Sequence, residues 1–370
     1  MFKKGWYDMA IITVVGAGVM GTALTFPAAD NGHTVRLVGT HLDTAIIDSV
    51  RADGTHPRLK RKIPESVTAY YHTDIAEAMQ DAEVIIVGVN SQGTTWGIEN
   101  IGPHLVPGQI LQLVTKGLET LDGNSISILP DVWHAKLPEA IRDKVHYAAI
   151  GGPSIAGELA ARHHTAVVFV CKEAEIAEKL RGYFLTDYYH IWTSTDMIGV
   201  ELCVALKNPY AFAAGLAAGV LEAKENAEPD VAGAKMHNFS AAVFAQGLAE
   251  TAYLVEKMGG GMETVYSLPG AGDLHVTTQG GRNSRFGRLI GMGLSYSDAV
   301  EEMPGETIEG VDAIIAVGPA IETMVENGSL DGARLPLFRQ LYRILTKHEP
   351  AMFNFDSFFA GLPFNPPPKK

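Results

Sequence analysis

A glycine-rich loop is the first pattern in the chain that points to chemistry. Gly16-Ala17-Gly18-Val19-Met20-Gly21 fits G-x-G-x-x-G and lies between a β-branched run and a helix-favouring segment. In such a loop Gly16 allows a tight turn, Gly18 lets the backbone approach a pyrophosphate, and Gly21 permits close helix packing. The helix N-terminus then faces the phosphates. The pattern also occurs in ordinary strand-to-helix turns, but this context favours dinucleotide binding.

Lys207 is a second candidate, because it follows the apolar helical stretch Leu202–Leu206. A lysine at such a place needs a partner or access to water. Two interpretations are open. The ammonium group can snorkel to water from a helix edge, or it can give and take a proton at a carbonyl/alcohol pair.

Four further residues, at three places in the sequence, lie at predicted strand ends or turns. Lys116 follows the predicted strand Ile110–Thr115, at the carboxyl end where doubly wound sheets bind ligands; a surface loop lysine is the structural alternative. Asp273 follows a glycine-rich turn, and its structural alternative is a helix cap. Arg282 and Asn283 combine a guanidinium fork with an amide donor, which suits phosphate oxygens, although such a pair in a glycine-rich loop is usually a turn.

The elements that must position these residues are of two kinds. In the first half, β-branched runs alternate with helix-favouring segments, which predicts a Rossmann-type, doubly wound α/β sheet. The second half is alanine-rich and helix-favouring, which predicts an all-helical domain. The predicted strands are Ile11–Val15, Thr34–Val38, Val84–Val89, Ile110–Thr115 and Val145–Ile150, and the predicted helices are Met20–Asn31, Gly199–Glu222, Phe239–Met258, Asp312–Asn327 and Leu337–Leu345.

These elements predict a dinucleotide-binding domain over residues 9–195, an all-helical substrate domain over 196–358 and a Pro-rich, loose tail over 359–370. The length of 370 residues agrees with two domains at about 150 residues each. Met9 is an alternative start of the chain.

Charge and composition limit the classes of partner. With 29 basic and 42 acidic residues the net charge is -13, which argues against nucleic acid and anionic membranes as binding partners. An anionic ligand therefore needs basic groups close to its binding site. The apolar stretch Pro209–Leu221 spans about 20 Å as a helix, short of the ~30 Å bilayer core, so no integral membrane segment is expected. Cys171 and Cys203 fit buried thiols in a reducing compartment, the cytoplasm. No Cys/His ligand spacing predicts a metal site.

Five further segments carry recognisable patterns: Val114–Glu119 (VTKGLE), Gly151–Glu158 (GGPSIAGE), Gly199–Asn208 (GVELCVALKN), Gly270–Leu274 (GAGDL) and Gly281–Gly287 (GRNSRFG). With the glycine loop, they resemble, in order and spacing, the soluble NAD(P)-dependent glycerol-3-phosphate dehydrogenases. The resemblance extends from about Ile11 to Leu345. One such segment alone is weak evidence, whereas six in the same order are specific.

The resemblance implies roles for particular residues. Lys207 falls on the family's catalytic lysine, which gives and takes the proton; Lys116 falls on a position over substrate and nicotinamide, and Asp273 on the acid that orients the lysine. These three are the implied catalytic residues. The implied substrate-binding residues are Lys116, Gly152, Ser154, Asn208, Asp273, Thr277, Arg282 and Asn283, the last two as a phosphate clamp, and the implied cofactor-binding residues are Gly16, Gly18, Val19, Met20, Gly21, Thr40, Lys116, Ala156, Arg282 and Glu309.

The resemblance implies NAD or NADP as the cofactor. An acid near the end of the second strand would bind the ribose 2′-hydroxyl of NAD, whereas an arginine would favour the 2′-phosphate of NADP. Asp43 comes late after that strand, and Arg36 lies within it. Both cofactors stay open, with a lean to NADP because the usual acid is missing.

Several positions depart from the family pattern. Gly281 stands where many members have Ser, Pro209 follows the lysine inside a predicted helix and is expected to kink it, and Glu222–His237 looks longer than its counterpart. Asn90 replaces a common Pro, and Thr94 stands where an aromatic residue often packs near the cofactor. These changes bear on substrate and cofactor preference more than on the type of reaction.

The expected activity is reversible reduction of dihydroxyacetone phosphate to sn-glycerol 3-phosphate, with a homodimer expected by analogy. A dehydrogenase of another phosphorylated polyol or ketose is the first alternative. A 3-hydroxy-acid dehydrogenase tends to carry Lys-x-x-Asn, whereas Lys207 and Asn208 are adjacent. A non-catalytic nicotinamide sensor would have lost the lysine or the clamp, and neither is lost.

Overall fold

The computed structural model describes residues 9–227 and 237–363, and these divide into two compact units. The N-terminal unit extends to Lys116 and resumes over Leu129–Val200. The helical unit comprises Gly117–Ile128 and the described residues from Glu201 onward. This division differs from the boundary expected at 195/196, since it lies five residues later and transfers Gly117–Ile128 to the second unit.

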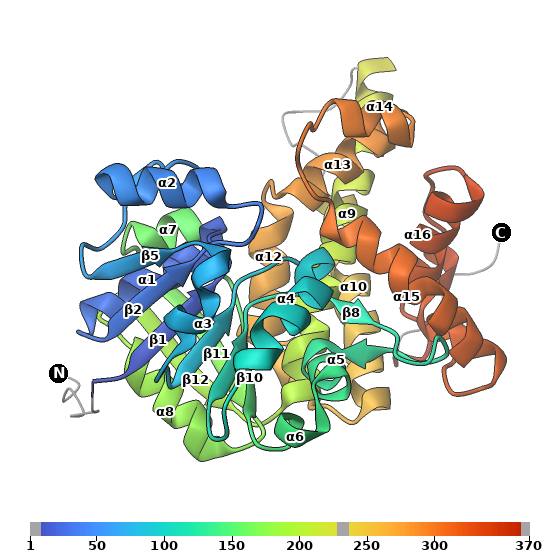
Figure 1. The fold of residues 1–370 in the computed structure, drawn as a ribbon. Helices are drawn as coiled ribbons and strands as arrows, with labels where there is room; N and C mark the ends of the chain where they lie inside the picture. The colour runs from blue at the N-terminus through green and yellow to red at the C-terminus, as the bar shows by residue number, and fades with distance from the viewer. Residues whose placement is uncertain (1–8, 228–236, 364–370) are drawn as a thin grey trace. The chain divides into compact units, whose positions relative to one another are not determined.

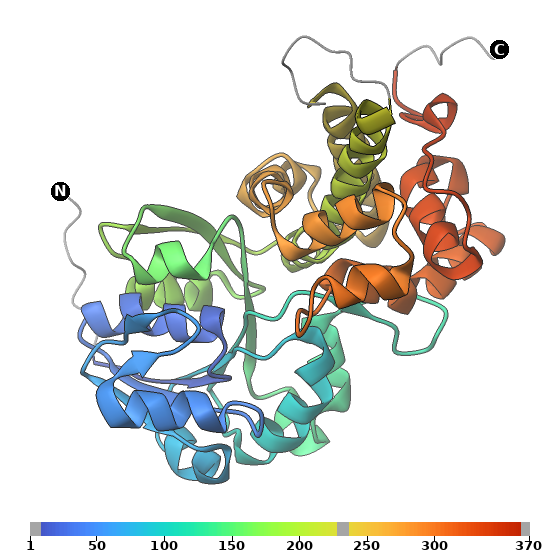
Figure 2. The same cartoon turned by 90° about the horizontal axis from the view of Figure 1, so that it is seen from above.

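Within the described residues, the N-terminal unit is built on an eight-stranded sheet with helices on both sides (Figures 1 and 2). The strand order is β12-β11-β10-β7-β6-β1-β2-β5, and neighbours are parallel except for the antiparallel pair β10 and β11. The strands are β1 (Ile11–Val15), β2 (Thr34–Val38), β5 (Val67–Tyr70), β6 (Val84–Val87), β7 (Ile110–Leu113), β10 (His146–Gly151), β11 (Thr165–Cys171) and β12 (Tyr189–Ser194).

The helices of this unit cover the two faces of the sheet. In β1, Ile12 and Val14 belong to the same apolar core as Leu24 of α1, whereas Thr13 points the other way and donates a hydrogen bond of 2.5 Å to the carbonyl of Ala78 in α3. Burial on both faces explains why β1 is a continuous apolar run. The helices are α1 (Val19–Asp30), α2 (Thr44–Asp53), α3 (Ile75–Met79), α4 (Thr94–Ile101), α5 (Leu129–Lys136), α6 (Glu139–Arg142), α7 (Ala156–Ala160) and α8 (Ala174–Phe184). Two short strands, β3 (Thr55–His56) and β4 (Arg61–Lys62), form an antiparallel pair of their own.

The helical unit is dominated by two long helices, α9 and α10 (Figure 1). α9 continues through Pro209 to Ala227, further than the sequence predicted. Of the long segment Glu222–His237, residues 228–236 lie outside the described residues. The elements are the hairpin β8 (Leu118–Glu119) and β9 (Ser127–Ile128), and α9 (Met197–Ala227), α10 (His237–Met258), α11 (Met262–Val265), α12 (Asp273–Thr278), α13 (Arg282–Gly291), α14 (Tyr296–Glu301), α15 (Glu309–Glu326) and α16 (Pro336–Lys347).

α9 is longer than the apolar stretch Pro209–Leu221, on which the prediction of no membrane segment rested. The helix over Met197–Lys224 is long and apolar enough to cross a membrane by length and composition. The helix reaches this length because it continues on both sides of the 13-residue stretch Pro209–Leu221. Since 78% of its most apolar window is buried, it has the character of a core helix.

Glycines fix the crossing of α9 and α13. Gly215 and Gly219 of α9 face Gly287 and Gly291 of α13, and a Cβ atom at any of these positions would collide with a backbone carbonyl oxygen of the other helix. The two backbones therefore pack in direct contact. This contact places the start of α13 beside the middle of α9, where the candidate clamp and lysine lie.

Residue 359, where the predicted tail begins, is held against the helical unit. Phe358 is buried, and the backbone N–H of Phe359 donates to Oε1 of Gln246 in α10 at 2.7 Å. Phe358 also contacts the rings of Phe353 and Phe355. The aromatic side chains hold this stretch against the unit, and the remaining residues 364–370 lie outside the described part of the chain.

Candidate active site

The glycine loop lies where the order of the parallel strands reverses, between β1 and β6. Open α/β sheets bind ligands at this switch point. Gly16 has φ 113°, and a Cβ there would come within 2.7 Å of the Gly88 carbonyl group at the end of β6. A Cβ at Gly21 would collide with the carbonyl oxygen of Gly16, so both positions require glycine. At Gly18 a Cβ would meet protein only at 3.8 Å, which leaves this face of the loop open to a ligand.

The first turn of α1 offers backbone donors to that ligand. Gly18 is the N-cap and has no side chain to bind them, and the carbonyl of Gly18 accepts from Thr22. The preceding N–H groups, including those of Val19 and Met20, therefore have no acceptor in the helix itself. A helix start of this kind favours a phosphate.

Asp43 and His56 also support the loop, a role that was not predicted from the sequence. Oδ2 of Asp43 accepts from the backbone N–H and the hydroxyl of Thr40, both at 2.8 Å, and from Ala17 N at 3.3 Å. Nε2 of His56 donates to the Ala17 carbonyl at 2.9 Å, and its Nδ1 accepts from Leu59 N. Burial lowers the pKa of His56, so the neutral ring makes both bonds.

Arg36 is directed away from the end of β2. Its guanidinium donates to the carbonyl oxygens of Ala78 at 3.1 Å and Gln80 at 2.6 Å, beside α3. It is thus occupied by the backbone of its own unit. In contrast, Asp43 lies at the loop despite its late position in the sequence, because it comes directly before α2 and the chain turns back there.

Other predicted residues of the N-terminal unit lie at the carboxyl ends of β7 and β10. Gly152 has φ 126°, and a Cβ there would approach Cα of Val167 to 3.1 Å. The hydroxyl of Ser154 lies 3.9 Å from Sδ of Met20 in α1, and Ala156 begins α7, which packs against α1. Lys116 follows β7 and is half-buried. The structure therefore brings Ser154 next to the glycine-loop helix.

Lys207 and Asp273 form an ion pair within the helical unit. Nζ of Lys207 donates to Oδ1 of Asp273, and the two side chains are 11% and 1% exposed. The lysine therefore does not snorkel to open water. Asp273 is the first residue of α12 and follows a π-helical turn, Leu268–Gly272, whose Gly270 leaves no room for a Cβ beside the Val265 carbonyl. The helix is capped at Gly272, so Asp273 pairs with the lysine instead of serving as the cap.

A hydrogen-bonded network joins α9, α13 and α15 near this pair. Nδ2 of Asn283 donates to Oδ1 of Asn208 at 3.0 Å, and Oδ1 of Asn283 accepts from Gly310 N at 2.7 Å. Nδ2 of Asn208 donates to Glu309 at 3.3 Å. Both asparagines are 4% exposed. The Asn283 amide is thus engaged by the protein, which leaves its backbone N–H, in the first turn of α13, as the better donor to a ligand.

Arg282 keeps an accessible guanidinium at the start of α13. Its side chain is 42% exposed, and its Nη2 lies 3.4 Å from Oε1 of Glu309, a long contact for an ion pair. Thr277, which is implied as a substrate ligand, lies in α12, and its hydroxyl donates to the Asp273 carbonyl at 2.6 Å. Arg282, Asn283 and Glu309 therefore form one group, and Lys207, Asp273 and Thr277 another, with Asn208 next to Lys207 in α9.

These features define a class of protein. A glycine loop at the switch point of a Rossmann-type sheet, followed by a helical unit with a buried lysine–carboxylate pair, is the arrangement of a two-domain nicotinamide-dependent dehydrogenase. Family models for NAD-dependent glycerol-3-phosphate dehydrogenase match residues 11–177 (N-terminus) and 196–353 (C-terminus). The chain belongs to this NAD-dependent glycerol-3-phosphate dehydrogenase family.

Individual relatives agree with the family assignment. The chain is 34% identical over 351 residues to an NADP(+)-dependent glycerol-3-phosphate dehydrogenase of Archaeoglobus fulgidus, covering 94% of this chain and 99% of the relative. It is 33% identical over 342 residues to a glycerol-3-phosphate dehydrogenase [NAD(P)+] of Bacillus cereus, covering 91% and 92%. The crystal structure of glycerol-3-phosphate dehydrogenase from Coxiella burnetii superposes with a TM-score of 0.78 at 28% identity, covering 93% and 96%. The predicted fold class and family are confirmed.

Proposed function

We propose that this protein interconverts dihydroxyacetone phosphate and sn-glycerol 3-phosphate with NAD(H) or NADP(H). Family membership supports the reaction type. The observation that carries the proposal is the buried pair of Lys207 and Asp273, which supplies a group able to exchange a proton among apolar surroundings. The nicotinamide, when bound, supplies or accepts the hydride at C2 of the substrate.

The residues of the N-terminal unit fit a dinucleotide. Gly16, Gly18 and Gly21 form an open loop at the switch point, and Val19 and Met20 offer backbone N–H groups to the pyrophosphate. Thr40 and Ala156 complete the proposed cofactor contacts of this unit, and Arg282 and Glu309 those of the helical unit. Asp43 and His56 position the loop, because both bind the backbone of Ala17.

We propose that the protein prefers NADP to NAD. The Asp43 carboxylate is already shared between Thr40 and Ala17, so it is less suited to a ribose 2′-hydroxyl than a free acid. The name of the Archaeoglobus relative specifies NADP(+). Arg36 is turned toward α3 and does not supply the cation for a 2′-phosphate. Initial rates measured with NADPH and with NADH test the cofactor preference.

Proton transfer is proposed for Lys207. Its ammonium group gives a proton to the C2 oxygen as the carbonyl is reduced, and takes it back in the reverse reaction. Asp273 accepts a hydrogen bond from Nζ and so fixes its direction. Lys116 polarises the carbonyl from the N-terminal unit, and Thr277 stabilises the helix that carries Asp273.

The phosphate group is proposed to bind at the start of α13. The exposed fork of Arg282 and the backbone N–H of Asn283 supply a charge and a donor to its oxygens. Asn208 acts indirectly, because it holds Asn283 against α9. Gly152 and Ser154 are proposed to line the substrate from the N-terminal unit.

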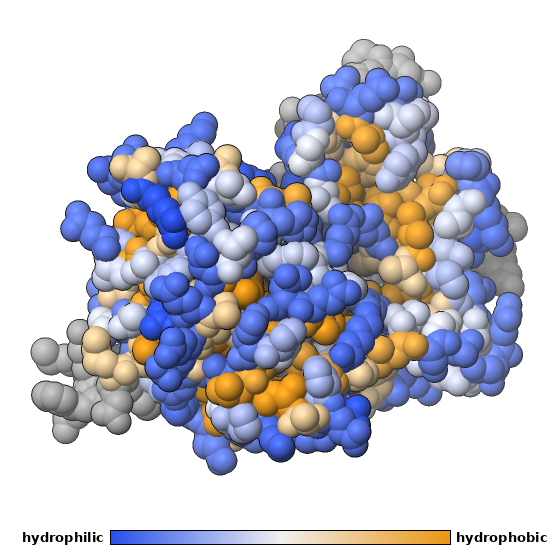
Figure 3. Space-filling view, in the orientation of Figure 1, coloured by the Kyte–Doolittle hydropathy of each residue, from blue (hydrophilic) through white to orange (hydrophobic). Residues whose placement is uncertain are grey.

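A cytoplasmic homodimer is the proposed state of the protein. Cys171 and Cys203 are both buried and are not joined in a disulfide, which suits a reducing compartment. Figure 3 shows apolar side chains gathered on the helical unit between the α13–α14 pair and α16. Apolar surface of this kind supports a protein–protein contact. The mass measured by light scattering tests the dimer.

The activity is tested by following oxidation of NADPH and NADH with dihydroxyacetone phosphate, longer ketose phosphates and unphosphorylated dihydroxyacetone. We expect oxidation with dihydroxyacetone phosphate above the others. Arg282→Gln should raise KM for this substrate about tenfold or more, since charged hydrogen bonds contribute about 1.5–3 kcal/mol. Arg285→Gln on the same helix is the matched control. A faster rate with a longer ketose phosphate favours the alternative substrate, and no oxidation with any compound favours the sensor.

A further inference from the structure

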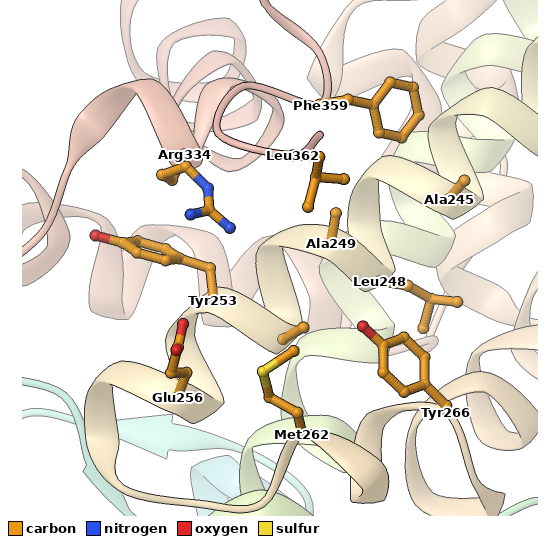
Figure 4. A pocket seen from close by; sticks show the side chains of 11 residues that line it. Ala245, Leu248, Ala249, Tyr253, Glu256, Met262, Tyr266, Arg334, Phe359 and Leu362 are labelled. Atoms are coloured by element: carbon orange, nitrogen blue, oxygen red, sulfur yellow. The ribbon is translucent and has the colours of Figure 1, made fainter. Parts of the chain in front are cut away.

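A cavity of about 300 Å³ lies in the helical unit, apart from Lys207 and the clamp residues. Figure 4 shows one wall formed by α10, where Leu248 and Ala249 line the space, and the other walls formed by residues such as Met262, Tyr266 and Leu362. Small-molecule pockets are mostly apolar, and this volume is at the lower end of their range of ~300–1,000 Å³. The cavity is therefore large enough for a small apolar group.

Two cations lie beside the ring of Tyr253, which lines this cavity, and one of them, Arg334, lines the cavity as well. The Arg334 guanidinium carbon lies 4.8 Å from the centre of the Tyr253 ring, and Nζ of Lys257 lies 5.8 Å from it. Among the described residues, neither cation has an ion-pair partner within 4 Å. A second cavity of about 390 Å³ is lined by Tyr253, Arg334, Lys257, Glu256 and Asp331, so the two spaces share the Tyr253–Arg334 wall.

The two carboxylates that line the second cavity, Glu256 and Asp331, form no ion pair within 4 Å with these cations among the described residues. Oδ1 of Asp331 accepts the N–H of Ala333 and caps its own turn. Glu256 is exposed and lines both cavities. The cations therefore remain available to an anion, in a chain whose net charge is -13.

The backbone around the cavity is held in an unusual conformation. Phe359 lines the cavity with φ 59°, a left-handed conformation that is uncommon for a residue with a large side chain. Gln246 fixes it through the Phe359 N–H. At Gly361, φ is 76° and a Cβ would come within 2.6 Å of Cδ of Arg334, so glycine is needed for the arginine stem to pass. Residues that hold such conformations are frequent at ligand sites.

We propose that this cavity binds an amphipathic organic anion, an alkyl carboxylate whose chain lies along Leu248, Met262 and Leu362 and whose head group binds Arg334 and Lys257. The apolar walls accept the chain, and the two cations beside Tyr253 accept the carboxylate. Glu256 opposes the head group by like-charge repulsion, which sets an upper limit to the affinity.

Isothermal titration calorimetry with hexanoate, octanoate and octanol tests the site on the full chain. Octanoate should bind more tightly than hexanoate by about fourfold for each added CH₂, the factor that corresponds to about 0.8 kcal/mol per buried CH₂. Octanol should bind more weakly than octanoate. Equal affinity for octanol and octanoate, or no binding of octanoate, would overturn the proposal.

Variants separate the charge from the cavity. Arg334→Gln should weaken the binding of octanoate about tenfold or more without changing the affinity for octanol. The control Arg58→Gln, at an exposed arginine of the N-terminal unit, should change neither affinity. Glu256→Gln should strengthen octanoate. A loss of octanoate affinity in the Glu256 variant would overturn the proposal in favour of a zwitterionic ligand.

Filling the cavity is the second line of the test. Ala249→Leu extends a side chain into the cavity and should weaken the binding of both octanoate and octanol at least tenfold. Ala241→Leu on the exposed side of the same helix is the matched control and should leave both unchanged. Circular dichroism establishes that both variants fold. Unchanged octanoate binding in folded Ala249→Leu would place the ligand elsewhere and overturn the proposal.

Discussion

Replacing Glu250 by glutamine should flatten the pH dependence of the stability of the helical unit. Glu250 lies in α10, is fully buried, and accepts hydrogen bonds from the N–H groups of Leu337 and Phe338 at the start of α16, at 2.6 and 2.8 Å. Gln246 and Tyr210 donate to it as well, at 2.8 and 3.0 Å. Tyr210 lies in α9, three residues after the proposed catalytic lysine, so this carboxyl group connects α9, α10 and α16.

Burial determines the sign of the effect. It raises the pKa of Glu250 from 4.5 to about 7, against the four hydrogen bonds from the described residues, which lower it. The folded state then binds a proton more tightly than the unfolded state. The contribution of Glu250 to stability is fully present below pH 4.5 and is lost as the pH rises through 7. A difference of about 2.5 units corresponds to roughly 3 kcal/mol.

Urea unfolding between pH 5 and pH 8 measures this contribution. All four tryptophans precede residue 197, so their fluorescence follows the first part of the chain, whereas far-UV circular dichroism also follows the helical unit. The difference in unfolding free energy between wild type and Glu250→Gln should change by about 2.5 kcal/mol across this range, in the direction of a less stable wild type at high pH. The contributions of the other titrating groups cancel, because both proteins contain them. Parallel curves for the two proteins would refute the reasoning that burial outweighs the hydrogen bonds.

Three other predictions concern Gly287, Asp43 and the two cysteines. Gly287→Ala should destabilise the helical unit by about 1–3 kcal/mol and raise KM for the phosphorylated substrate, because its Cβ pushes α13 away from α9; thermal unfolding and initial rates measure both. Asp43→Ala should weaken cofactor binding about two- to tenfold in a fluorescence titration, since Thr40 and the glycine loop lose a shared acceptor; unchanged affinity would remove Asp43 from the loop. Burial raises the pKa of Cys171 to about 12, and Cys203 is 2% exposed, so neither thiol should react with a disulfide reagent at pH 8 until denaturant is added.

The Rossmann-type sheet was predictable because its central strands are buried on both faces. β1, β2 and β6 are short apolar, β-branched runs, and they were predicted at the right places. β11 is a run of the same kind and was missed, although the signal is present in TAVVFVC. β5, with alternating burial over four residues, is too short to distinguish from a loop. The antiparallel pairing of β10 with β11 is not encoded in either strand alone.

The candidate site was predictable in its residue types and less so in its contacts. Lys207 and Asp273 are 66 residues apart, and their pairing depends on how α12 follows a π-helical turn. The side-chain amide of Asn283 binds Asn208 of α9 and Gly310 of α15, and these contacts depend on how α9, α13 and α15 pack together. Local sequence indicates which groups can bind phosphate, but tertiary packing decides which of their atoms remain available.

The turnover of Lys207→Ala, measured together with cofactor affinity, tests the central claim most directly. If Lys207 exchanges the proton with the substrate oxygen, the rate of dihydroxyacetone phosphate reduction should fall by about 10²–10⁴-fold. NADPH affinity, followed by fluorescence titration, should stay near the wild-type value, because the glycine loop belongs to the other unit. A near-normal rate in the folded variant would contradict the assignment of Lys207 as the proton-transfer residue.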